Sequence, residues 1–147
     1  MKQFCCTLLF FLATLTSYAQ NFADFFQDKT LRVDYIFTGD ANRQAIYLDE
    51  LSQLPSWAGR QHHLSELPLA GNGQIIVKDV ATGQCIYKTS FSSLFQEWLS
   101  TDEARTTAKG FENTFLLPFP KKTVEVEITL YSPRKDVMAN FKHIVSP

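Results

Sequence analysis

An all-β, antiparallel two-sheet β-sandwich of the immunoglobulin-like kind is the fold class that the sequence predicts. Apolar and polar residues alternate in short segments along most of the chain, as they do in strands with one buried face. Turn-forming residues separate these segments. A helical period occurs in only one segment, so the spacing of a βαβ unit is absent. About seven strands and one short helix are therefore expected.

Residues 1–19 are predicted to be a secretory signal peptide rather than part of this fold. Lys2 precedes an apolar run that ends near Leu15, and Ser17-Tyr18-Ala19 places small residues at the two positions that a signal peptidase reads. A transmembrane anchor is the competing interpretation. The run is, however, shorter than the roughly 18 to 20 apolar residues that span a bilayer. Secretion to the periplasm or the cell surface is expected.

The mature chain is expected to begin at Gln20 and to form a single accessory domain, residues 20–147, which is long enough to bury a core. The whole sequence has a formal net charge of −1, and loss of Lys2 makes it −2. This near balance gives no electrostatic reason to expect nucleic acid or an anionic membrane as partner. Because position 20 is not the Cys of a lipoprotein, no membrane anchor is expected after cleavage.

Cysteine usage predicts a domain without an intrachain disulfide. Cys5 and Cys6 belong to the predicted signal peptide, which leaves Cys85 alone. The exported domain must then be held together by its core, for which the aromatic residues, 14% of the sequence, supply large apolar area.

The first two predicted strands are residues 31–38 and 44–51, separated by turn residues from Gly39 to Asn42. Alternation places one set of side chains toward the core: Leu31, Val33, Tyr35, Phe37, Ile46 and Leu48. It places Arg32, Asp34 and Thr38 toward water. The polar residues of this stretch therefore indicate a solvated sheet face rather than a catalytic site.

An irregular stretch, residues 55–72, is predicted to be a long surface connection because it has no sustained period. A β-hairpin is predicted over residues 74–90 around the turn Ala81-Thr82-Gly83-Gln84, where Gly83 can adopt the positive φ of a tight turn. Cys85 lies two residues before Tyr87, so both side chains are expected on the same face of the strand. This predicts that Cys85 is a small buried hydrophobic residue and not an activated thiolate.

One short helix is predicted after the hairpin. Its inward stripe is Leu94, Phe95, Trp98 and Leu99, and Ser93 and Gln96 have the spacing of a capping box. An aromatic stripe of this kind is expected to plug one end of the core rather than to bind a ligand.

Three more strands complete the predicted sandwich. One ends at Pro118, and Pro120 keeps the chain out of a central ladder position. The next, residues 123–131, alternates Val124, Val126, Ile128 and Leu130 against Glu125, Glu127 and Thr129. After turn residues 132–136, residues 140–147 form the last strand.

Histidine and acidic residues offer no predicted metal or catalytic site. His62 and His63 with Glu66 form the one cluster that invites a metal assignment, but adjacent histidines diverge, and the H-E-x-x-H zinc signature is absent. His143 is distant in sequence. Glu125 and Glu127 would stand about 7 Å apart on one strand face, a spacing that glycosidase chemistry could use only inside a cleft.

Other candidate motifs also fall short of a site. The serines lack a G-x-S-x-G elbow, and Gly71-Asn72-Gly73 precedes a predicted strand where a phosphate-binding loop would precede a helix. Trp57 lies in a loop, where its ring could either pack on the core or stack on a sugar; the core is the favoured interpretation. No catalytic, cofactor-binding or metal-binding residue is predicted, and no cofactor.

Several segments, taken in chain order, resemble the N-terminal domain of secreted bacterial zinc metallopeptidases of the IgA-peptidase family. The matching segments are DKTLRVDY followed by TG, WAGR, VKDVATGQCIYKTSFSSLFQEW leading to TDEA, and PFPKKTVEVEI. Together they cover most of residues 22–147. Each segment is short, and their combination carries the specificity.

This resemblance implies an accessory β-sandwich ahead of a catalytic domain. In the family the zinc ligands and general-base Glu lie in the H-E-x-x-H of that downstream domain, so the chain itself is expected not to be an enzyme, whereas a full-length relative would be a metalloendopeptidase. The expected role is to support or position the protease domain or its protein substrate. Its expected partner is the downstream peptidase domain in cis or a protein substrate.

Two questions stay open at this point. The chain is either a piece of a longer peptidase or a stand-alone relative that kept the accessory module. A carbohydrate-binding module of an exported protein is the alternative function, because exported β-sandwiches often present aromatic side chains to sugars and Trp57 is available for that role.

Overall fold

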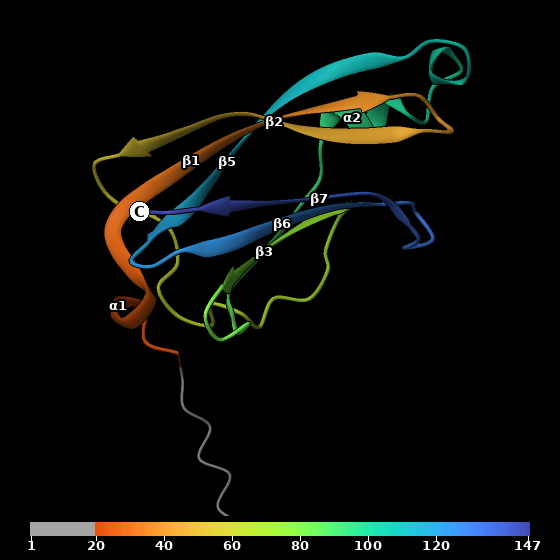
Figure 1. Cartoon of the computed structure of the whole chain (residues 1–147). Helices are drawn as coiled ribbons and strands as arrows, with labels where there is room; N and C mark the ends of the chain where they lie inside the picture. The colour runs from red at the N-terminus through yellow and green to blue at the C-terminus, as the bar shows by residue number, and fades with distance from the viewer. Residues whose placement is uncertain (1–19) are drawn as a thin grey trace, which may run out of the picture.

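A β-sandwich built from two antiparallel sheets is the architecture of the computed structural model, which describes residues 20–147; the predicted signal peptide lies outside the described residues. Figure 1 shows the two layers, with the long strand β1 curving from the end near α1 toward the end near α2. The strands are β1 (Phe26–Gly39), β2 (Gln44–Leu54), β3 (Gly73–Asp79), β4 (Cys85–Phe91), β5 (Lys109–Pro120), β6 (Val124–Tyr131) and β7 (Val137–Val145). The predicted fold class is confirmed.

The sheet order separates the chain into a three-stranded and a four-stranded layer. The first sheet has the order β2-β1-β5 and the second the order β4-β3-β6-β7, with every pair antiparallel. β5 is therefore an edge strand, as Pro120 predicts, because proline has no N–H to donate to a ladder. The strand continues to Pro120, two residues beyond its predicted end at Pro118. β2 and β7, which are edge strands of opposite sheets, contact each other.

The core lies between the inward faces of the two sheets, where the predicted alternation holds. Leu31, Val33, Tyr35 and Phe37 of β1 are buried, and so are Val124, Val126, Ile128 and Leu130 of β6. Aromatic rings fill the space beyond them. Phe91 lies 4.5 Å from Phe115, centroid to centroid, and Phe37 stacks on Phe91. Because large rings bury the most apolar area per residue, this cluster is a main source of the hydrophobic stabilisation.

Three short helical segments flank the sheets: α1 (Phe22–Phe25), α2 (Leu94–Trp98) and the 3₁₀ turn η1 (Glu103–Arg105). The predicted helix is α2. Phe95 is buried against Phe37 and Phe111, so the predicted plug over one end of the core is present. Leu94 contradicts the prediction because its side chain is 70% exposed. It lies about 100° around the helix from Phe95, off the inward stripe.

The predicted N-cap of α2 is confirmed, although only half of the capping box forms. The Ser93 hydroxyl accepts a hydrogen bond from the Gln96 amide at 3.4 Å. The Gln96 Oε1 accepts from the Ser93 hydroxyl at 3.4 Å and not from the Ser93 backbone amide. The Gln96 Nε2 donates to the Asn72 carbonyl at 2.7 Å, which ties α2 to the residue before β3. Asn72 also accepts from the Tyr131 amide, so the Gly71-Asn72-Gly73 segment has a structural role.

The connection between β2 and β3 is less superficial than the sequence predicts. Leu64, within this stretch, is only 1% exposed, and its carbonyl accepts a hydrogen bond from the Lys88 amide of β4 at 2.8 Å. Arg60 donates to the carbonyls of Leu64 and Lys88, and its guanidinium lies 4.8 Å from the centre of the Tyr87 ring. The connection therefore covers the outer edge of β4.

Candidate functional site

The histidines that the sequence singled out do not come together. His62 and His63 lie on the connection between β2 and β3 and are exposed, and His63 Nδ1 is 2.9 Å from a carboxylate oxygen of Glu66. His143 lies on β7. Among residues 20–147 no group of three or more His, Cys, Asp or Glu side chains is placed to hold a metal ion. The surface-loop interpretation of His62 and His63 is confirmed.

Cys85 is half-buried and lies on the opposite sheet face from Tyr87, contrary to the shared parity that the sequence indicates. A β-bulge causes the difference: Val77 pairs with Tyr87, but the next residue, Lys78, pairs with Cys85 and skips Ile86. Burial raises the pKa of the Cys85 thiol, so the thiol stays protonated and unreactive at neutral pH. Cys85 is therefore not an activated nucleophile.

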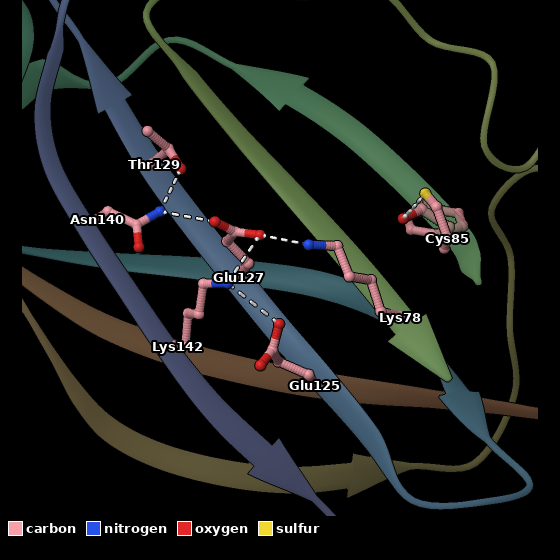
Figure 2. Close-up of polar contacts among 8 residues, drawn as sticks. Lys78, Cys85, Glu125, Glu127, Thr129, Asn140 and Lys142 are labelled. Atoms are coloured by element: carbon pink, nitrogen blue, oxygen red, sulfur yellow. Dashed lines mark hydrogen bonds and ion pairs between the residues drawn. The ribbon is translucent and has the colours of Figure 1, made fainter. Parts of the chain in front are cut away.

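The most concentrated polar arrangement lies on the outer face of the four-stranded sheet, and we call it the Glu127 network (Figure 2). It consists of Lys78 on β3, Glu125 and Glu127 on β6, and Asn140 and Lys142 on β7. Antiparallel register places these side chains opposite one another across three strands, because residues paired across a ladder point to the same face.

Every carboxylate of the Glu127 network has a cationic partner. Lys78 Nζ lies 2.8 Å from Glu127, and Lys142 Nζ lies 3.4 Å from Glu125 and 3.5 Å from Glu127. The Asn140 amide donates to Glu127 at 3.0 Å and to the hydroxyl of Thr129 at 2.8 Å. The two glutamates and two lysines balance in charge.

The electrostatics of the Glu127 network do not suit acid–base catalysis. Burial alone would raise the pKa of Glu127, but the hydrogen bonds from Lys78 and Asn140, together with the positive charges of Lys78 and Lys142, hold the pKa below its ordinary value. The same Glu127 contact raises the pKa of Lys78. A general acid of the glycosidase type needs a carboxyl group with a raised pKa. The network therefore fixes strand register on a solvated face.

Trp57 packs on the core, as the sequence favours. Its side chain is 9% exposed, its ring lies 6.1 Å from Tyr87 in an edge-on arrangement, and its Nε1 donates to the Arg60 carbonyl at 3.1 Å. Gly59 permits this position, because a Cβ there would lie 2.2 Å from the indole ring. The indole ring is therefore not exposed for stacking on a sugar.

Two surface hollows stand out on the described part of the chain. One of about 540 Å³ lies beside Leu54, Trp57 and Leu116 and is mainly apolar. The other, about 230 Å³, lies between Gln44 and Gln96 where the β1–β2 turn, α2 and the β6–β7 turn meet. The residues that line these two hollows include no pairing of a nucleophile with a general base.

One buried polar pair connects the two sheets and was not predicted. The Tyr35 hydroxyl on β1 and His143 Nε2 on β7 lie 2.7 Å apart, although the residues are 108 positions apart in sequence. Burial lowers the pKa of His143 and raises the pKa of Tyr35, so both are neutral at neutral pH. Strand parity places each of them inward, but nothing in the sequence pairs one with the other.

The sequence of this chain matches the model of a known protein family. The family model described as the peptidase M64 N-terminus matches residues 21–142. The chain belongs to this family. Peptidase M64 is the IgA-peptidase family of metallopeptidases, so the resemblance noted in the sequence is confirmed. No curated protein matches the chain.

As an M64 N-terminal domain, the chain is an accessory module of M64 peptidases. None of the helices in residues 20–147 is long and apolar enough to cross a membrane. The match covers all seven strands except the last residues of β7, so the family corresponds to the sandwich itself.

Proposed function

We propose that residues 20–147 act as a non-catalytic module of an exported zinc metallopeptidase, where they support or position the protease domain or hold its protein substrate. The observation that carries this proposal is the M64 N-terminal match across residues 21–142. The neutralised Glu127 network and the protonated Cys85 thiol support a role in structure or binding. The proposed partner is the peptidase domain in cis or a protein substrate, and the proposed location is the periplasm or the cell surface.

The first test measures proteolysis by the module alone. Purified residues 20–147, with zinc added, should leave a protein substrate and a short peptide substrate intact, because the residues described here include no zinc-binding cluster. Zinc-dependent cleavage that a chelator stops, and that co-purifies with the module, would contradict a non-catalytic role.

The second test distinguishes a module that holds the substrate from one that supports the peptidase fold, and both from a module without effect on the peptidase. Residues 20–147 are joined to an M64 peptidase domain, and kcat/KM is compared with that of the domain alone on a protein substrate and on a short peptide. A module that holds substrate raises kcat/KM for the protein and leaves the peptide unchanged, since only the larger substrate reaches both sites. A module that supports the peptidase fold raises both. Equal values with and without the module would defeat the proposal.

A carbohydrate-binding role is the weaker candidate. Its motivation was an exposed Trp57, and that ring lies against Tyr87 and Gly59. A glycan screen with residues 20–147 should therefore give no binding that a Trp57→Phe variant abolishes.

A further inference from the structure

The outer edge of β5 presents backbone groups that no other strand within residues 20–147 satisfies. β5 borders the three-stranded sheet and, among the described strands, pairs only with β1. In Figure 1 its half near Lys109 forms the outer margin of that sheet. An edge of this kind carries unpaired N–H and C=O groups that can template another strand. We call residues 110–116 the open edge of β5.

Two hydrogen bonds and one proline establish which residues of the open edge have backbone groups that point outward. Asp40 donates to Arg43 beyond the β1–β2 ladder, so the even-numbered residues at this end of β1 bond to β2 and the odd-numbered ones to β5. Lys121 donates to Phe25 just past β5, which also directs the odd-numbered residues of β5 toward β1. Pro118 is consistent with this assignment: as an even-numbered residue it has its backbone nitrogen on the side away from β1, where its missing N–H costs no ladder hydrogen bond.

Parity therefore turns the backbone N–H and C=O groups of Gly110, Glu112, Thr114 and Leu116 away from β1. Within residues 20–147, none of these four residues takes part in a backbone hydrogen bond outside the strand ladders. The edge of β4 differs, because Leu64 and Arg60 cover it. The open edge is thus an available ladder at least four outward-facing residues long.

Aromatic side chains line the inner side of this edge. Phe111 and Phe115 point into the sandwich, where they pack on Phe95 and Phe91, yet both stay half-buried. Asn113 lies between them and donates to the Phe111 carbonyl at 2.9 Å. A strand added to β5 would cover the remaining ring surface of both phenylalanines, so apolar side chains four residues apart in that strand suit this edge.

The sequence of the open edge itself has this pattern, Phe111-Glu112-Asn113-Thr114-Phe115, and its two phenylalanines are placed symmetrically about Asn113. We propose that the open edges of two copies of this chain pair antiparallel about a two-fold axis at Asn113, joining two three-stranded sheets into one. Phe111 of one copy then faces Phe115 of the other, and Glu112 faces Thr114. The pairing forms about eight backbone hydrogen bonds, two for each outward-facing residue of one strand.

Neighbouring registers are worse for identifiable reasons. A shift toward Lys109 centres the axis on Glu112 and sets two like charges opposite each other. A shift in the other direction centres it on Thr114 and places Gly110 opposite Pro118, which cannot donate. Only the register centred on Asn113 keeps proline out of the ladder, separates the glutamates and pairs aromatic with aromatic.

The register is tested by cross-linking in a Cys85→Ala background. Asn113→Cys places two thiols across a non-hydrogen-bonded pair, where Cα atoms are about 4.5 Å apart and a disulfide is allowed. Glu112→Cys is the matched control: its copies lie two residues out of register, too far for a disulfide. Asn113→Cys should form a covalent dimer under mild oxidation at least about tenfold faster than Glu112→Cys. Equal rates, or faster linkage of Glu112→Cys, would overturn the proposed register.

The association itself is tested by sedimentation equilibrium. A strand-edge interface is small, so the wild-type chain should dimerise with a Kd of about 10 to 100 µM. Glu112→Pro removes an outward N–H from an exposed edge position and should weaken dimerisation by about tenfold or more. Glu112→Thr keeps the N–H and should leave the Kd within about threefold. Far-UV circular dichroism verifies that each variant folds.

A wild-type chain that stays monomeric at about 1 mM, or a folded Glu112→Pro variant that dimerises as well as Glu112→Thr, would overturn the proposal. If Glu112→Pro does not fold, the cross-linking rates decide. This pairing does not depend on the proposed peptidase role, since neither experiment uses a substrate.

Discussion

Replacing Trp57 with Ala tests whether the connection between β2 and β3 is part of the folded core. The indole is 9% exposed, so nearly all of a surface of about 200 Å² is removed from water. At about 25 cal/mol per Å² this burial contributes about 4 to 5 kcal/mol. The lost hydrogen bond from Nε1 to Arg60 adds about 1 kcal/mol, while partial collapse of the site offsets some of the loss. We expect Trp57→Ala to lower the free energy of unfolding by about 4 kcal/mol.

The assay is urea unfolding followed by far-UV circular dichroism, which does not depend on the fluorescence of the mutated residue. Trp57→Phe is the control, because it keeps an aromatic ring against Tyr87 and loses the Nε1 donor; it should cost about 1 to 2 kcal/mol. A loss below about 1 kcal/mol for Trp57→Ala would show that the ring does not support the fold. The packing described for this loop would then be wrong.

Two further predictions concern a turn and a buried pair. Gly39→Ala should destabilise the chain by about 3 kcal/mol or more, because φ at Gly39 is +132° and the new Cβ would lie 1.9 Å from the Arg43 carbonyl oxygen. Gly83→Ala is the control: φ is +70° and the space around it is open, so it should cost only about 1 to 2 kcal/mol. Thermal unfolding of both variants checks this order. Burial lowers the pKa of His143 below its unfolded value of 6.5, so the folded state binds fewer protons, and stability should fall as pH drops below 6.5. His143→Gln should flatten that part of the urea-measured pH profile, and an unchanged slope would exclude His143 as its source.

The strands could be predicted because a sheet with one buried face needs apolar and polar residues to alternate along each strand. From Leu31 to Phe37 in β1 and from Val124 to Leu130 in β6 every second side chain is apolar, and the structure buries these side chains. The prediction began β1 at Leu31 instead of Phe26, because alternation fails where the register between β1 and β5 shifts near Thr30. Such a shift depends on both strands, and one strand's pattern does not encode it.

Contacts between distant segments could not be predicted either, because they also depend on more than one segment of the chain. The pairing of Tyr35 with His143 depends on how the two sheets are stacked, and the position of Cys85 depends on a bulge. Leu64 lies in a stretch without periodicity, where nothing distinguishes a buried leucine from an exposed one. The resemblance to M64 N-terminal domains could be recognised because it uses short segments from the whole chain, most of which form strands and turns.

Arg60 closes one side of the sandwich from the connection between β2 and β3. Its planar guanidinium donates to the carbonyls of Leu64 and Lys88 and lies over the Tyr87 ring, so one side chain holds the connection between β2 and β3 against β4. With the hydrogen bond from the Lys88 amide to the Leu64 carbonyl, Arg60 therefore shields the margin of β4 against sheet extension by a foreign strand, a protection that the margin of β5 does not have within the described part of the chain.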